Sequence, residues 1–123
     1  MDALTQWTHS WRIALEYKSV RRTPRYSLVV DVEMTDPLSE MQIRARTKML
    51  SMCGCGVESS LLFPRATSVR IRFLHQDAEV RALGRVVYSS SDLGMGVAFT
   101  TLEREDERIL ECWIADYLTI PVK

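Results

Sequence analysis

The sequence predicts an all-β fold: a six-stranded antiparallel β-barrel with an added N-terminal helix and a C-terminal helix. Six segments show the alternation of apolar and polar residues that marks a strand with one buried face. They follow one another at close spacing, and closing such a sheet into a barrel removes its exposed edges. Apolar residues at three- and four-residue spacing before and after these segments predict the two helices.

The first predicted helix covers residues 3–18, which contain no Gly or Pro. Its apolar stripe consists of Leu4, Trp7, Trp11, Ala14 and Leu15. A polar connector rich in arginine follows over residues 19–25, where Pro24 disfavours a helical conformation at Thr23. The chain is therefore expected to divide into an N-terminal amphipathic helix, residues 1–18, and the barrel domain with its C-terminal helix, residues 19–123.

Turn signals separate the predicted strands, beginning with Thr35-Asp36-Pro37. The strands are predicted over Tyr26–Met34, Ile43–Met49, Val57–Leu62, Val69–Phe73, Val80–Tyr88 and Gly94–Phe99. We expect Gly54 and Gly56 to interrupt regular structure before the third strand. After the last strand, an apolar helical stripe runs from Glu103 to Leu118, and the acidic residues of its first turn complement the helix dipole.

Composition narrows the functional classes. At 123 residues with 46% apolar and 26% charged residues, the chain is expected to be one folded domain. No apolar run approaches the roughly 20 residues that a bilayer span requires, and no secretory signal is visible, so we expect a cytoplasmic protein without membrane insertion. A formal net charge of zero argues against binding of a nucleic acid polymer.

No constellation in the sequence predicts catalysis or metal binding. His9 and His75 are isolated from any nucleophile or paired carboxylate at a motif spacing. Cys53 and Cys55 lack the second cluster that a zinc site needs, so they are expected to be core or turn residues. The protein is therefore expected not to be an enzyme and to hold no cofactor.

Two short motifs stand out from this background. The first is Arg21-Arg22-Thr23-Pro24-Arg25, just before the first strand, and the second is Met49-Leu50-Ser51-Met52-Cys53-Gly54, after the second. Their order and placement resemble the PilZ domain family, which carries R-x-x-x-R and [D/N]-x-S-x-x-G at these points. The resemblance covers roughly residues 19–118.

The resemblance implies a barrel that binds the bacterial second messenger cyclic di-GMP and transmits the binding event to a partner protein. The implied ligand-binding positions are Arg21, Arg22, Arg25, Met49, Ser51 and Gly54. An arginine fork fits phosphate oxygens and the O6 and N7 acceptors of guanine, and guanidinium also stacks on the ring. Ser51 would supply a hydroxyl, and Gly54 would allow close approach of the backbone or a positive φ.

Met49 departs from the family pattern, which has Asp or Asn at this position. A thioether cannot replace their hydrogen bonds, and an unpaired base edge costs about 1–3 kcal/mol. Two outcomes stay open: cyclic di-GMP binding with reduced affinity, or a degenerate domain that acts only as a protein–protein interaction module, with the Trp7 and Trp11 helix as a docking surface. A barrel that binds single-stranded nucleic acid is a further alternative, but zero net charge and 8% aromatic residues weigh against it.

Overall fold

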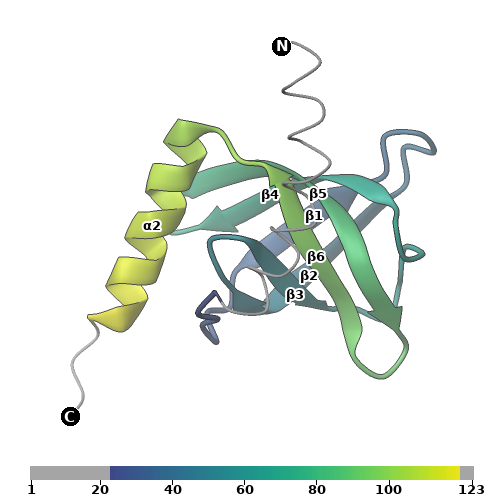
Figure 1. Ribbon diagram of the computed structural model, residues 1–123, viewed down its shortest axis with the longest axis horizontal. Helices are drawn as coiled ribbons and strands as arrows, with labels where there is room; N and C mark the ends of the chain where they lie inside the picture. The colour runs from purple at the N-terminus through teal and green to yellow at the C-terminus, as the bar shows by residue number, and fades with distance from the viewer. Residues whose placement is uncertain (1–22, 120–123) are drawn as a thin grey trace.

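The computed structural model describes residues 23–119, which form a closed antiparallel barrel of six strands with one helix beside it (Figure 1). The order around the barrel is β1-β2-β3-β6-β5-β4, and β4 pairs with β1 to close it. The predicted fold class is thereby confirmed. The predicted N-terminal helix lies outside the described residues. The elements are β1 Asp31–Thr35, β2 Gln42–Leu50, β3 Gly54–Glu58, β4 Ser68–His75, β5 Ala78–Ser90, β6 Gly94–Thr101 and α2 Arg104–Leu118.

The strands turn their alternating apolar side chains inward to form one core. The Phe73 ring of β4 meets the Phe99 ring of β6 edge to face, with centroids 5.8 Å apart. This geometry suits the ring quadrupoles and adds to the area that both rings bury. The largest fully buried side chains include Phe73, Met34, Ile43, Leu50, Met95 and Leu110. The last of these belongs to α2, so the helix and the barrel share a single core.

Helix α2 packs beside β5 through the apolar stripe that the sequence predicts (Figure 1). Trp113 and Ile114 are buried, and Trp113 meets the His75 ring edge to face at 5.2 Å. At the start of the helix, the Asp106 carboxylate accepts a hydrogen bond of 3.0 Å from the backbone N–H of Arg81. The helix is thus held both by apolar burial and by a polar contact to β5. No helix among residues 23–119 is long and apolar enough to span a membrane.

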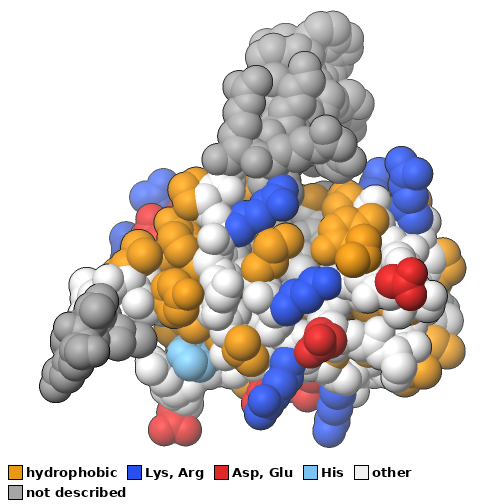
Figure 2. All heavy atoms as spheres, turned by 90° about the horizontal axis from the view of Figure 1, so that it is seen from below, with side chains coloured by type: hydrophobic (Ala, Val, Ile, Leu, Met, Phe, Trp, Pro, Cys, Tyr) orange, Lys and Arg blue, Asp and Glu red, His pale blue; other side chains and the backbone are white. Residues whose placement is uncertain are grey.

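The outer face of the barrel carries arginines that alternate with the buried positions. The Arg72 guanidinium lies 3.2 Å from the carboxylates of both Glu33 and Glu79, and the Arg44 guanidinium lies 3.5 Å from the Glu33 carboxylate. A hydrogen bond from Arg81 holds the pKa of Glu79 below its ordinary value, and Arg72 acts in the same direction. Figure 2 shows a face on which Lys and Arg side chains lie beside Asp and Glu side chains. The guanidinium groups of these pairs are exposed to solvent, so each pair contributes little stability.

Two strands, the first and the third, differ from the sequence-based expectation by more than two residues at one end or both. The first ladder begins at Asp31, and among the described residues before it, 23–30, the one β-bridge is Tyr26 with Leu50. The third strand covers Gly54–Glu58 instead of Val57–Leu62. The glycines do not interrupt it, because both Gly54 and Gly56 pair with β6. Periodicity fails here because glycine has no side chain that reports which face is buried.

The core predicts a position-dependent loss of stability. Phe73→Ala should lower the free energy of unfolding by about 3–5 kcal/mol, because it leaves a cavity where two rings meet. Leu83→Ala is the control, since this outward residue of β5 is 46% exposed. Its cost should not exceed about 1 kcal/mol, the span of strand propensities. Urea unfolding measures both, and equal losses would contradict the assigned inner and outer faces.

Candidate functional site

The residues that precede β1 run beside the end of β2, and we call residues 23–30 the lead-in segment. Tyr26 and Leu50 exchange two backbone hydrogen bonds, of 3.0 Å from the Tyr26 N–H and 2.9 Å from the Leu50 N–H. Further upstream, Thr23 Oγ1 lies 3.4 Å from Cys53 Sγ. These contacts hold Arg25 between two points attached to β2 and to the turn that follows it.

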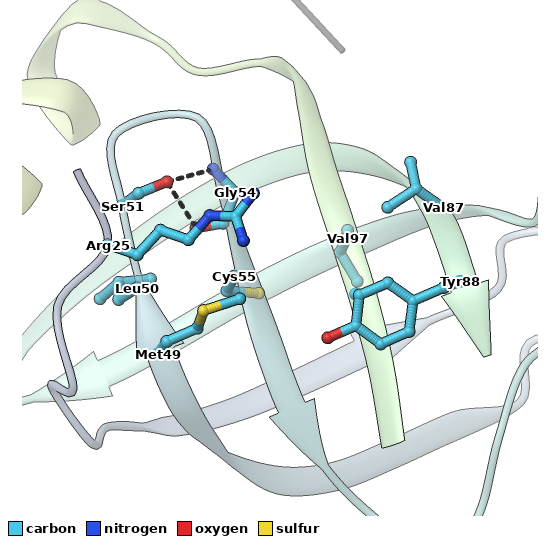
Figure 3. A pocket seen from close by; sticks show the side chains of 10 residues that line it. Arg25, Met49, Leu50, Ser51, Gly54, Cys55, Val87, Tyr88 and Val97 are labelled. Carbon is cyan, nitrogen blue, oxygen red and sulfur yellow. Dashed lines mark hydrogen bonds between the residues drawn. The ribbon is translucent and has the colours of Figure 1, made fainter. Parts of the chain in front are cut away.

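The turn after β2 is organised by the Ser51 side chain, which is 3% exposed. Its hydroxyl accepts hydrogen bonds of 3.1 Å from the N–H groups of Cys53 and Gly54. It donates to the Gly54 carbonyl at 3.2 Å (Figure 3). A hydroxyl has one proton to donate, and this one is used inside the turn. The geometry therefore indicates that the Ser51 hydroxyl shapes the turn.

Gly54 is required by the close approach of β6. A Cβ at this position would lie 2.2 Å from the Val97 carbonyl oxygen, too close for any side chain. Its φ is not positive; Gly94 is the glycine that adopts a left-handed conformation. The sequence analysis gives two reasons for a glycine here, close backbone approach and a positive φ, and the first is the relevant one. The close neighbour is the backbone of β6 in the same chain.

A pocket of about 390 Å³ opens between the lead-in segment and four strands (Figure 3). The structure brings four of the six sequence-predicted positions to its wall: Arg25, Met49, Ser51 and Gly54. Arg21 and Arg22 lie outside the described residues. The remaining lining residues come from β2, β3, β5 and β6: Leu50, Cys55, Val87, Tyr88, Gly96 and Val97.

Tyr88 is a pocket residue that the sequence reasoning missed. Figure 3 shows it across the pocket from Arg25, with its hydroxyl directed into the space between them. Burial raises the pKa of Tyr88, with Cys55 acting in the same direction and Arg25 against it, so the hydroxyl stays neutral. Gly96 of β6 pairs with Tyr88 and leaves room for the ring, since an added Cβ there would lie 2.0 Å from it. This pairing joins two strands in the folded barrel, so the sequence alone carried no signal for Tyr88.

Sulfur-containing side chains line the part of the pocket beside β2 and β3. Met49 is half-buried and lies over Gly56, where an added Cβ would be 3.1 Å from the Met49 Cγ. Burial raises the pKa of Cys55 to about 12, so its thiol is protonated at neutral pH. Cys53 lies half-exposed in the turn. Within residues 23–119, no three His, Cys, Asp or Glu side chains are placed to hold a metal ion.

The arrangement suits a planar anionic ligand. One guanidinium, one aromatic ring with a neutral hydroxyl, and a tight turn surround a space within the usual range of about 300–1,000 Å³ for small-molecule sites. A cation and a ring on opposite sides of a pocket offer charge pairing and stacking together. Among residues 23–119, the titratable side chains that line the pocket are Arg25, Cys55 and Tyr88.

Solved structures with the same fold include three that are informative. The PilZ domain with cyclic di-GMP of YcgR from Escherichia coli superposes with a TM-score of 0.62 at 17% identity, covering 79% of this chain and 89% of that one. The PilZ domain of CeSA from a cellulose-synthesizing bacterium gives 0.60 at 20% identity, covering 80% and 100%. At such identities the likeness shows the fold.

The Bacillus subtilis inhibitor of motility, MotI, superposes with a TM-score of 0.61 at 17% identity over 80% of this chain. The chain spans only about half of that protein, 51% of its length. None of the curated proteins matches the sequence. The family profile named PilZ domain matches residues 19–116. Since this match covers most of the sequence and the described strands close the same barrel, the chain belongs to the PilZ domain family.

Proposed function

We propose that the protein is a cyclic di-GMP receptor that transmits binding of this messenger to a partner protein. The observation that carries the proposal is that one pocket collects Arg25, Met49, Ser51 and Gly54, residues of two motifs that are far apart in the sequence. Membership of the PilZ family and the cyclic di-GMP in the similar YcgR domain support the choice of ligand. We propose no catalytic step, and we place the protein in the cytoplasm, where such a messenger acts.

Each pocket residue has a part in the proposed complex. Arg25, together with Arg21 and Arg22 just upstream, contacts phosphate oxygens or a guanine edge through charge-assisted hydrogen bonds. The Tyr88 ring offers a platform on which a guanine stacks. The Ser51 hydrogen bond keeps the turn after β2 in shape. Gly54 lets that turn approach β6 closely, so that the turn does not obstruct the pocket beneath the ligand.

Met49 lowers the affinity of the proposed complex. Its thioether lies over Gly56 and presents neither a strong donor nor a strong acceptor to a base edge. The same observation favours a second candidate function, a degenerate PilZ domain that acts only as a protein–protein interaction module. Calorimetric titration of the full chain with cyclic di-GMP separates the two, because only the receptor gives a saturable binding isotherm.

Removing the guanidinium should weaken binding. Arg25→Ala should raise the Kd for cyclic di-GMP about 10- to 100-fold, the worth of a charge-assisted contact of about 1.5–3 kcal/mol. Arg25→Lys should fall between, since an ammonium cannot form the bidentate fork. Arg70→Ala, on the outer face of β4, is the matched control and should leave the Kd unchanged. Equal affinity of Arg25→Ala and the parent would remove Arg25 from the site.

Restoring an amide at the departing position should tighten binding. Met49→Asn should lower the Kd about tenfold or more, because the amide pairs a base edge that the thioether leaves without a partner. Met41→Asn makes the same chemical change at an exposed position before β2 and should have no effect on the Kd. If Met49→Asn binds no better than the parent, the assignment of residue 49 to the ligand contact is wrong.

The aromatic platform should depend on the ring and not on the hydroxyl. Tyr88→Ala should weaken binding by about 5- to 100-fold, since base stacking on an aromatic side chain is worth about 1–3 kcal/mol. Tyr88→Phe should bind nearly as well as the parent in the same titration. An equal loss for both variants would show that the hydroxyl makes the contact and would overturn the stacking role.

A further inference from the structure

Among residues 23–119, two polar side chains are buried, Thr47 and Ser51. Ser51 lines the pocket, whereas Thr47 does not. Thr47 lies on β2, is 2% exposed, and faces the lead-in segment. Its hydroxyl donates to the Leu28 carbonyl at 2.9 Å and accepts from the Val30 N–H at 2.9 Å. Its own N–H donates to the Val30 carbonyl at 3.0 Å. One residue thus fastens three backbone groups of the lead-in segment.

These contacts occur where regular pairing fails. Tyr26 lies opposite Leu50 and Val30 lies opposite Thr47, so these two pairs are out of register with each other. Between them, the three residues 27–29 of the lead-in segment lie opposite only two residues of β2, 48 and 49. The pairing of β2 with β3 is also irregular between Thr47 and Met49. An uneven ladder leaves backbone groups without partners, and leaving them buried is costly. The Thr47 hydroxyl supplies the donor and the acceptor that the ladder omits.

We infer that Thr47 is a positioning residue for Arg25: its hydroxyl fixes the backbone at residues 28–30 and thereby holds the guanidinium over the pocket. The inference rests on the proposed function for its effect on affinity. The lead-in segment is attached to β2 at two points, the Tyr26–Leu50 bridge and Thr47. When the hydroxyl is lost, the Thr47 N–H still donates to the Val30 carbonyl, but the Leu28 carbonyl and the Val30 N–H lose their partners. Residues 28–30 then loosen, the neighbouring Tyr26–Leu50 bridge loosens with them, and Arg25 samples positions away from the ligand.

Val and Ser variants separate positioning from packing. Thr47→Val keeps the side-chain volume and removes both hydroxyl hydrogen bonds, whereas Thr47→Ser keeps the hydroxyl. Measured by calorimetry at a temperature where every variant is folded, Thr47→Val should raise the Kd for cyclic di-GMP by about three- to tenfold, a typical coupling between interacting groups. Thr47→Ser should restore it. Thr35→Val, which removes an exposed hydroxyl from β1, is the matched control and should bind as the parent does.

A double-mutant cycle provides the readout that a purely structural role would not change. In an Arg25→Ala background, Thr47→Val should cause a clearly smaller loss of affinity than in the parent, because the guanidinium that it positions is gone and only the proposed contacts of Arg21 and Arg22 remain. Additive losses would overturn the inference, since they would mean that Thr47 acts on the ligand by another route. An unchanged Kd for Thr47→Val in the parent background would overturn it as well.

Amide hydrogen exchange tests the same inference without ligand. Thr47→Val should speed exchange in a fragment covering residues 24–30, while exchange in β4 and β5 stays as in the parent. If the parent does not bind cyclic di-GMP, the proposed receptor function fails, and exchange alone decides the positioning role. Uniformly faster exchange throughout the barrel, or no change at residues 24–30, would contradict it.

Discussion

The backbone pairing of the lead-in segment with β2 is the interaction on which the candidate site depends. One strand carries Met49, continues into the turn of Ser51, and receives the bridge from Tyr26. Without that pairing, Arg25 would belong to a tail beside the barrel. With it, a cation from outside the barrel faces an aromatic ring from β5 across one pocket. The position of the pocket is thus set by strand pairing, and the side chains form its lining.

Two buried hydroxyls refine this placement among residues 23–119. Ser51 satisfies the amides of its own turn, and Thr47 satisfies the groups that an uneven ladder leaves open. Burying a hydroxyl is favourable only where its hydrogen bonds are complete, so each one selects a single backbone arrangement. The apolar core stabilises the barrel as a whole, whereas these polar contacts specify where the lead-in segment and the turn after β2 lie.

The fold was predictable from periodicity because the barrel turns one face of each strand inward. Val32 and Phe73, for example, fall on the apolar side of strict alternations and are buried as expected. The third strand was misplaced because Gly54 and Gly56 carry no side chains to show alternation. The bridge at Tyr26 looked like continuous strand because sequence alternation continues there, although the ladder does not.

The sequence by itself determined the barrel, the terminal helix and the motif positions, because hydrophobic period and residue spacing are local properties of the chain. Only the tertiary structure decided that Arg25 and Ser51 share a wall, that Tyr88 faces them, and that Gly54 serves the approach of β6. Those facts depend on register between strands distant in sequence, where a shift of one residue turns a side chain to the opposite face.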